Sequence, residues 1–145
     1  MVQAVVEATS GGSYDKALRD TFPGTTIHAN VTECGRTTPG RHFIGSKAVI
    51  WEAGFDAAGG AYGYTCGTIG DLAAFAVDHL QDPEVGRVVD TGHPGQGYAS
   101  GWRVTTENDK RATHWHTGTV PGYFSAIHLD PASGDGVVIL MNASS

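Results

Sequence analysis

Apolar residues recur at helical spacing in the first part of the chain. The valines near the start predict a helix over residues 2–9, which Gly11-Gly12 would end. Ser13 is suited to cap a second helix, with an apolar face that runs to Phe22. Pro23-Gly24 ends this second helix, because proline cannot continue it. The N-terminal part is therefore predicted to be helical.

Residues 24–67 show no sustained periodicity. Their glycines, threonines and isolated aromatic residues predict a long ordered excursion over a surface. A third helix is predicted over residues 68–81. It begins with Thr68-Ile69-Gly70-Asp71, a capping box in which aspartate replaces the usual glutamate.

From about residue 98 the pattern changes from helices to strands separated by polar turns. We predict adjacent antiparallel strands over Tyr98–Thr105, Arg111–Val120, Tyr123–Leu129 and Asp135–Asn142. Residues 137–141 are continuously apolar, which is typical of a strand buried on both faces. Helices followed by an antiparallel meander predict an α+β fold, in one domain over residues 1–145.

The composition limits the class of protein. The 145 residues include 40% hydrophobic and 17% charged residues and 21 glycines, with a net charge of -6. We therefore expect a globular, loop-rich domain that does not bind nucleic acid, because phosphate binding needs a basic face. No run approaches the ~18 apolar residues of a membrane span.

The sequence leaves the cellular location unknown. Cys34 and Cys66 lack the spacing of a zinc or thioredoxin-like motif, and both a disulfide and two buried thiols fit them. The N-terminus has no basic stretch and places Glu7 inside its short apolar segment, so it does not have the pattern of a signal peptide.

The segment that carries most chemistry lies in the second predicted strand, at His116-Thr117-Gly118-Thr119. On a strand, His116 and Gly118 face one side and Thr117 faces the other. A glycine in a strand often marks close approach of a ligand or another backbone, and imidazole can exchange protons near neutral pH. This pattern predicts a substrate-lining strand, and the alternative is an ordinary surface histidine in a hairpin.

An ordered set of motifs resembles the serine β-lactamases and DD-peptidases of the class C type. These motifs are Gly11-Gly12-Ser13-Tyr14, Ala58-Gly59-Gly60, Asp71-Leu72-Ala73-Ala74-Phe75, Tyr98-Ala99-Ser100-Gly101-Trp102-Arg103, His116-Thr117-Gly118 and Val137-Val138-Ile139-Leu140-Met141-Asn142. His-Thr-Gly replaces the superfamily's Lys-Thr-Gly in the DD-carboxypeptidase branch and in related esterases. The resemblance implies the C-terminal half of a β-lactamase/DD-peptidase-like fold, with an antiparallel sheet and flanking helices.

The resemblance also implies roles in acyl transfer through a serine acyl-enzyme. His116 and Thr117 would line the cleft beside Gly118 and contact the terminal carboxylate of the substrate. The backbone N–H of Thr119 would form half of an oxyanion hole. The implied substrates are acyl-D-Ala-D-Ala peptides, β-lactams or simple esters, and no cofactor is implied.

Two further residues are candidates for substrate binding. Arg103 would help to hold the carboxylate, and a solvated strand residue is the alternative. If the family geometry is kept, Arg103 converges with His116 and Thr117 on one anion-binding patch. Trp51 resembles a cleft-wall tryptophan, and a core aromatic residue is the alternative.

Two family signatures, Ser-x-x-Lys and Tyr-x-Asn, have no counterpart at their expected place before the first helix. The sequence contains one Ser-x-x-Lys, Ser13-Tyr14-Asp15-Lys16, which we interpret as a solvated helix start. We therefore expect a fragment that is inactive alone and that would have the missing N-terminal half as its partner. The absence of the family's N-terminal strand and C-terminal helix predicts an exposed sheet edge or face.

Two other functions stay open. One is a zinc-binding module through His114 and His116, with His128 on the neighbouring strand, although no carboxylate or cysteine is placed to complete it. The other is a non-catalytic peptide-binding remnant that keeps the carboxylate pocket and lacks the nucleophile.

Overall fold

The computed structural model describes residues 1–35, 37–51, 60–61, 63–82, 89–93, 96–99, 101–107 and 111–144. The chain divides into two compact units. The first comprises Met1–Asp71, Thr119–Phe124 and Met141–Ser145, and the second comprises Leu72–Gly118 and Ser125–Leu140. None of the helices in the described ranges is long and apolar enough to cross a membrane.

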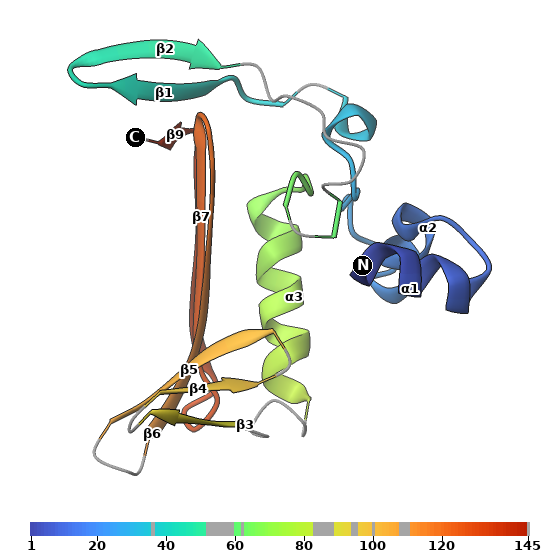
Figure 1. The fold of residues 1–145 in the computed structure, drawn as a ribbon, viewed down its shortest axis with the longest axis vertical. Coiled ribbons are helices and arrows are strands. Elements are labelled where there is room, and N and C mark those ends of the chain that lie inside the picture. Colours follow the sequence, from blue (N-terminus) through green and yellow to red (C-terminus); the bar gives the residue numbers. More distant parts are fainter. Residues whose placement is uncertain are drawn as a thin grey trace. The chain divides into compact units, whose positions relative to one another are not determined.

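The three predicted helices are confirmed: α1 (Val2–Ser10), α2 (Tyr14–Thr21) and α3 (Ile69–Gln81), all visible in Figure 1. Gly11 ends α1 in the left-handed conformation, with a φ of 68°. Ser13 caps α2, because its Oγ accepts a hydrogen bond from the backbone N–H of Lys16 at 3.2 Å.

Residues 24–67 contain regular structure that the hydrophobic pattern did not predict. A short 3-10 helix, η1 (Val31–Cys34), precedes the hairpin of β1 (Gly40–Ile44) and β2 (Lys47–Trp51), and β9 (Ala143–Ser144) pairs with β1 in parallel. The register pairs the two residues on either side of Gly45-Ser46, which leaves a two-residue turn. A Gly-Ser turn is a known hairpin signal. The strands beside this turn lack the alternation of apolar and polar residues that usually identifies a strand. Val49 and Ile50, for example, are consecutive apolar residues and both are exposed.

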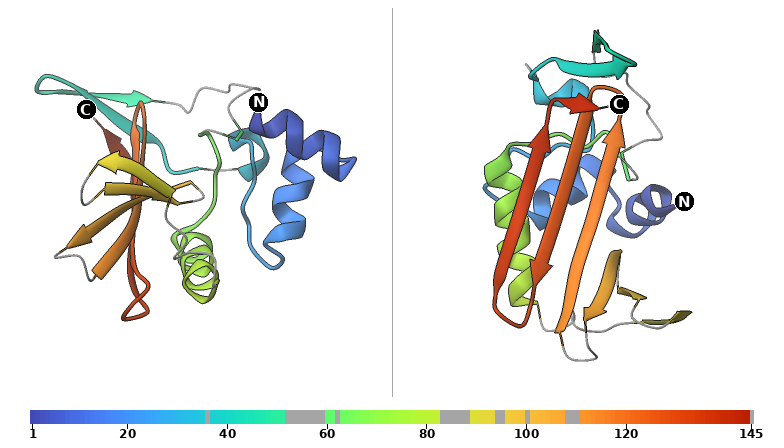
Figure 2. Two further views of the ribbon diagram at one scale, coloured as in Figure 1. Left: turned by 60° about the horizontal axis from the view of Figure 1, so that its bottom comes forward. Right: turned by 90° about the vertical axis from the view of Figure 1, so that its left-hand side faces the viewer.

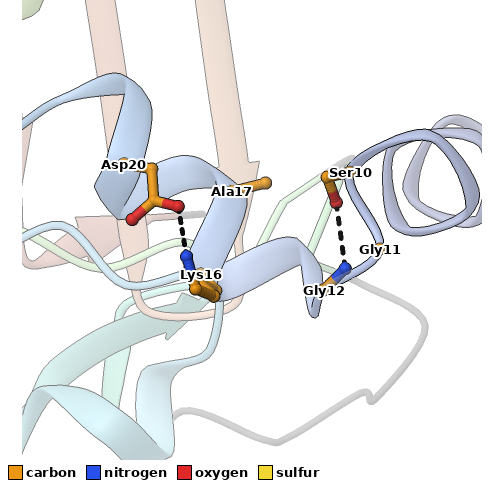
Figure 3. A pocket seen from close by; sticks show the side chains of 6 residues that line it. All are labelled: Ser10, Gly11, Gly12, Lys16, Ala17 and Asp20. Atoms are coloured by element: carbon orange, nitrogen blue, oxygen red, sulfur yellow. Dashed lines mark hydrogen bonds and ion pairs between the residues drawn. The ribbon is translucent and has the colours of Figure 1, made fainter.

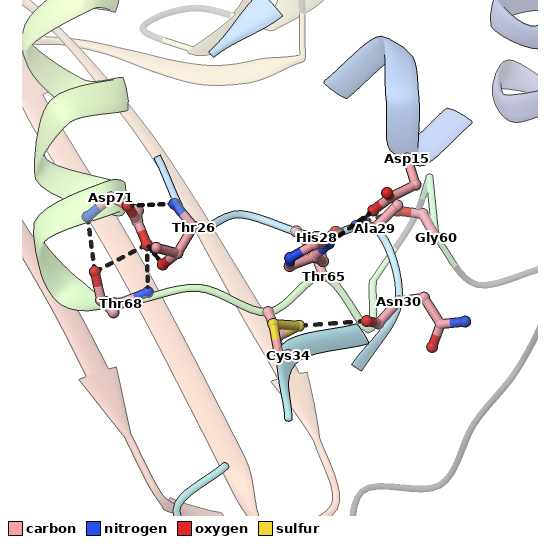
Figure 4. The surroundings of a disulfide bond; sticks show 11 residues. Asp15, Thr26, His28, Ala29, Asn30, Cys34, Gly60, Thr65, Thr68 and Asp71 are labelled. Atoms are coloured by element: carbon pink, nitrogen blue, oxygen red, sulfur yellow. Dashed lines mark hydrogen bonds and ion pairs between the residues drawn. A yellow bond between two sulfur atoms is a disulfide. The ribbon is translucent and has the colours of Figure 1, made fainter. Parts of the chain in front are cut away.

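One carboxylate connects the beginning of residues 24–67 to the start of α3 by hydrogen bonds. The Asp71 side chain, only 8% exposed, accepts hydrogen bonds from Thr26 N at 3.0 Å and Thr26 Oγ1 at 2.6 Å. It also accepts from Thr68 N at 2.8 Å, and Thr68 Oγ1 in turn accepts from Asp71 N at 3.2 Å (Figure 4). This reciprocal pair confirms the predicted capping box.

A second set of contacts holds the middle of residues 24–67 in place. Asp15 of α2 accepts a hydrogen bond from Ala29 N at 2.9 Å. The backbones of His28 and Cys66 exchange two hydrogen bonds of 3.0 Å. Cys34 and Cys66 form a disulfide, with a Cα–Cα distance of 6.2 Å (Figure 4). The disulfide decides between the two alternatives that the sequence left open for these cysteines.

The remaining strands form a sheet in the order β3-β4-β5-β6-β7-β8. Their bounds are β3 (Val89–His93), β4 (Gln96–Ala99), β5 (Trp102–Glu107), β6 (Arg111–Val120), β7 (Tyr123–Asp130) and β8 (Asp135–Met141). The last three agree with the predicted strands to within a residue. The predicted single strand Tyr98–Thr105 is wrong, because the chain turns at Gly101, with a φ of 95°, and β4 and β5 pair as antiparallel neighbours.

The apolar core of the second unit lies between α3 and one face of the sheet. Its buried residues are Ala76, Trp102, Ile127 and Leu129, with Leu72, Phe75, Leu80 and Val138 packed against them. Figure 2 shows α3 running alongside the strands of this sheet. Each large side chain buried here contributes about 1.5–3 kcal/mol. The core therefore identifies which face of each strand points toward α3.

The prediction that residues 137–141 are buried on both faces is wrong. Exposed fractions are 60% for Val137, 41% for Ile139, 44% for Leu140 and 47% for Met141. β8 is the last strand in the sheet order, and within the described ranges no strand pairs with its outer edge. The predicted exposed sheet edge with apolar side chains is confirmed, and such a surface favours association.

The buried carboxylate of Asp71 gives a prediction about acid stability. Burial alone would raise the pKa of Asp71, but hydrogen bonds from Thr26 and Thr68 outweigh it and hold the pKa well below its usual range. The stabilisation is therefore present above about pH 4 and lost as the pH falls toward the folded-state pKa. Asp71→Asn should lower the free energy of unfolding at neutral pH by about 1–3 kcal/mol. In urea unfolding, the difference from the wild type should shrink below about pH 4.

A matched control is Asp78→Asn, since Asp78 is an exposed aspartate of the same helix. It should change the free energy of unfolding by less than about 0.5 kcal/mol. An Asp71→Asn defect that stayed constant from neutral to acid pH would contradict the proposed linkage.

Two imidazoles of the second unit lie in or beside its core. His114 on β6 is 0% exposed, and neither of its ring nitrogens has a hydrogen-bond partner in the described part of the chain. Its ring centroid lies 6.5 Å from that of His79 on α3, which stacks on Trp102 at 4.4 Å. Burial lowers the pKa of His114, and the neighbouring His79 lowers it further. Burial also lowers the pKa of His79, and the negative charges of Asp82 and Asp78 offset part of this effect by favouring the charged imidazole.

This pair predicts loss of stability in mild acid. Because the folded-state pKa values are depressed, the stability is complete above about pH 6.5 and falls as the pH drops toward them. His114→Phe keeps a ring in the core and removes the titrating group. Its free energy of unfolding, measured in urea, should depend less on pH between about 7 and 5 than that of the wild type. The control is His128→Gln, at an exposed position of β7, which should change the free energy of unfolding at neutral pH by less than about 0.5 kcal/mol.

Candidate active site

The second half of β6 carries the predicted catalytic residues on an open strand edge. β5 pairs with β6 from Glu107↔Arg111 to Arg103↔Trp115, and the pairing ends there. From His116 onward, no strand in the described ranges pairs with this edge of β6. The residues at this end, His116, Thr117, Gly118 and Thr119, are all exposed. Such an edge offers backbone N–H and C=O groups to an extended peptide.

Side-chain alternation divides the candidate residues between the two faces of the sheet. His114 points into the core beneath α3, so His116 shares that face and Thr117 lies on the other. Arg103 is the cross-strand partner of Trp115 and therefore shares the face of Thr117. The structure thus brings Arg103 and Thr117 onto one face. The expectation that His116 converges with them on one patch is not supported, because neighbouring strand residues point to opposite faces.

Glycine is needed at position 118 because a neighbouring side chain, which the sequence pattern did not point to, leaves no room for a Cβ atom. A Cβ atom at Gly118 would lie 2.7 Å from the hydroxyl oxygen of Ser125 on β7. Real side chains do not approach so closely, so any residue other than glycine would displace Ser125. The alternation of side chains along β7 could have identified Ser125, because Ser125 lies on the same inward face as Ile127.

The Ser-x-x-Lys of α2 does not form a nucleophile and base. Ser13 Oγ accepts the backbone N–H of Lys16, and the Lys16 ammonium pairs with the carboxylate of Asp20. Figure 3 shows Lys16 turned toward Asp20. Both residues line a small pocket of about 90 Å³. The lysine and aspartate side chains are each 63% exposed. This geometry supports the interpretation of the motif as a solvated helix cap.

The zinc alternative is not supported by the placement of its histidines. His114 is enclosed in the core, whereas His116 is exposed. His128 lies on the opposite face of the sheet, because its neighbours Ile127 and Leu129 point into the core. No group of three or more His, Cys, Asp or Glu side chains in the described part of the chain is arranged to hold a metal ion.

Two sequence motifs are only partly visible. Trp51 ends β2, and its side chain lies outside the described residues. Ala58-Gly59 also lies outside them, whereas Gly60 is described and packs against Ala29, whose carbonyl oxygen would be 3.1 Å from an added Cβ. The cleft-wall role of Trp51 stays a prediction.

Comparison with known proteins agrees with the arrangement of strands and helix. The family model for beta-lactamase matches residues 1–145. No curated protein matches the chain. The crystal structure of a D-stereospecific amidohydrolase from Streptomyces sp. is similar, with a TM-score of 0.74 and 19% sequence identity.

The match covers 97% of this chain and 47% of that amidohydrolase, so the chain spans about half the length of its structural relative. At this identity the likeness shows the fold alone, which is a β-lactamase-like arrangement of helices and antiparallel strands covering part of the relative. Because the family model extends over residues 1–145, the chain belongs to the beta-lactamase family of serine hydrolases.

Proposed function

We propose that the chain contributes the substrate-binding strand of a DD-carboxypeptidase-like enzyme, which cleaves acyl-D-Ala-D-Ala peptides through a serine acyl-enzyme. The observation that carries the proposal is the open edge of β6, with His116-Thr117-Gly118-Thr119 exposed along it. An extended peptide laid against this edge would find backbone hydrogen bonds and polar side chains together. The structural relative is named a D-stereospecific amidohydrolase, which is compatible with an amide substrate of D configuration.

The terminal carboxylate of the peptide would bind on the outward face of the sheet. Arg103 and Thr117 share this face, and a guanidinium can donate two parallel hydrogen bonds to a carboxylate. The hydroxyl of Thr117 would supply a further donor. This arrangement favours peptides with a free C-terminus over their amides, because an amide carries no negative charge.

The reacting carbonyl would lie at the strand edge. The N–H of Thr119 would stabilise the negative charge that develops on the carbonyl oxygen when a serine hydroxyl attacks. The proton that the serine hydroxyl loses in this attack would reach the amine of the leaving D-Ala through His116, since imidazole exchanges protons near neutral pH. Water then releases the acyl group from the serine.

We assign the nucleophile to a segment outside this sequence, which would carry Ser-x-x-Lys and Tyr-x-Asn. The support is the Ser13 hydroxyl, which is already engaged as a helix cap, and Lys16, which is paired with Asp20. The same observation favours the second candidate, a peptide-binding remnant without catalysis. Acylation tests whether the chain has its own nucleophile, and reconstitution tests whether it belongs to an active enzyme.

The chain alone should form no covalent adduct with a labelled penicillin, because acyl transfer needs an activated hydroxyl. Mass spectrometry after incubation should show the unmodified mass. The control is Ser13→Ala, which should behave in the same way. A penicilloyl adduct on the wild type that is absent from Ser13→Ala would overturn the helix-cap interpretation of Ser13.

With the catalytic segment supplied in trans or by fusion, His116→Ala should lower kcat for a D-Ala-D-Ala peptide by about 100-fold or more. The free energy of unfolding should change little, because His116 is exposed. Arg103→Ala should chiefly raise KM, because it removes a binding contact. Steady-state kinetics and urea unfolding measure both effects, with His128→Ala as control. If neither substitution changes kcat or KM of the reconstituted enzyme, the chain has the family fold but does not use these residues as a substrate-binding site.

A further inference from the structure

The guanidinium of Arg103 lies over the ring of Trp115. Their residues are direct cross-strand partners on β5 and β6, and Arg103 Cζ is 5.0 Å from the indole centroid. This distance is within the range of a cation–π contact. In the described part of the chain no carboxylate forms an ion pair with Arg103, which is itself exposed. The indole is therefore the neighbour that determines where this positive charge is held.

The Trp115 indole is itself held in place by the neighbouring strand β5. Trp115 Nε1–H donates to Thr105 Oγ1 at 3.0 Å, which ties the ring to β5, and the side chain is half-buried. Thr113, the cross-strand partner of Thr105, donates from its hydroxyl to the Thr105 carbonyl at 3.4 Å. A half-buried side chain that is held by a hydrogen bond retains fewer rotamers than an exposed, unbonded one. Trp115 can thus act as a rigid platform.

A stacked guanidinium keeps its hydrogen-bonding capacity. Stacking occupies the flat face of the group, whereas its five N–H donors point outward in the plane. Those donors stay available to a carboxylate on the face that also carries Thr117. An unstacked arginine loses rotamer freedom when it binds, and a stacked one has already lost part of it.

We propose that Trp115 is a positioning residue for carboxylate recognition, because its indole holds the Arg103 guanidinium ready for the C-terminal carboxylate of a peptide. The inference rests on the proposed function for the identity of the ligand. Trp115 directly precedes the His116-Thr117-Gly118 motif, so the same strand positions both the arginine and the residues at the reacting end of the peptide.

The test uses the full chain and an acyl-D-Ala-D-Ala peptide, with its C-terminal amide as matched ligand. Dissociation constants come from NMR titrations of the wild type, Trp115→Leu, Trp115→Phe and Arg103→Ala. The wild type should prefer the free carboxylate. Trp115→Leu should weaken binding of the carboxylate peptide by about 3- to 30-fold and leave the amide unchanged. Trp115→Phe keeps a ring and loses the bond to Thr105, so it should restore part of the affinity.

The Arg103 side-chain proton shifts supply a readout that a merely structural role would not change. Stacking over a ring moves these resonances upfield, and this shift should be present in the wild type, reduced in Trp115→Phe and absent in Trp115→Leu. The double variant of Trp115→Leu with Arg103→Ala should bind no more weakly than Arg103→Ala alone, because the indole acts through the arginine. Far-UV circular dichroism identifies any variant that fails to fold.

The outcomes separate the two proposals. If Arg103→Ala weakens binding of the carboxylate peptide and Trp115→Leu does not, the positioning role is overturned and the proposed function stands. If the wild type does not prefer the carboxylate over the amide, or Arg103→Ala has no effect, the carboxylate site is overturned together with the inference. An additive double variant also counts against the inference, because it would show that Trp115 acts independently of Arg103.

Discussion

The burial of one carboxylate determines where the longest helix starts. Asp71 is nearly inaccessible to water, and an unpaired carboxylate in that position would cost several kcal/mol. Four donors, the N–H and hydroxyl groups of Thr26 and Thr68, remove that cost. The first turn of α3 is fixed as a result, and the residues that follow present Phe75, Ala76 and their neighbours to the sheet. Because α3 covers one face of β6, the direction of each side chain on this strand is determined.

Alternation on β6 then separates two kinds of chemistry. The face toward α3 receives His114 in the core and His116 at the exposed end of the strand, whereas the other face receives Trp115 and Thr117. The proposed anion binding and the proposed proton transfer would therefore use different sides of one strand. The open edge of the strand lies between these sides. A peptide lying along that edge can reach both faces without crossing the sheet.

The elements that the sequence predicted well are those set by neighbours along the chain. The caps at Ser13 and Thr68 and the bounds of β6 depend on a few consecutive residues. The features that it left open, did not predict or predicted wrongly depend on distant partners. The Cys34–Cys66 disulfide, the pairing of β1 with β9 and the exposure of β8 are decided by which segments meet in space. The break between β4 and β5 was missed because Gly101 fits the interior of a strand and a turn equally well by composition.

The same distinction applies to the candidate site. The His-Thr-Gly motif indicated which residues to consider, since its information is contained in consecutive positions. It did not indicate that Arg103 lies beside Trp115, because these residues belong to different strands and meet through the register of β5 and β6. A shift of one residue in that register would move Arg103 to the face of His116. The proposed anion recognition would therefore depend on strand pairing, because the pairing of β5 with β6 is what places the Arg103 guanidinium over the Trp115 ring.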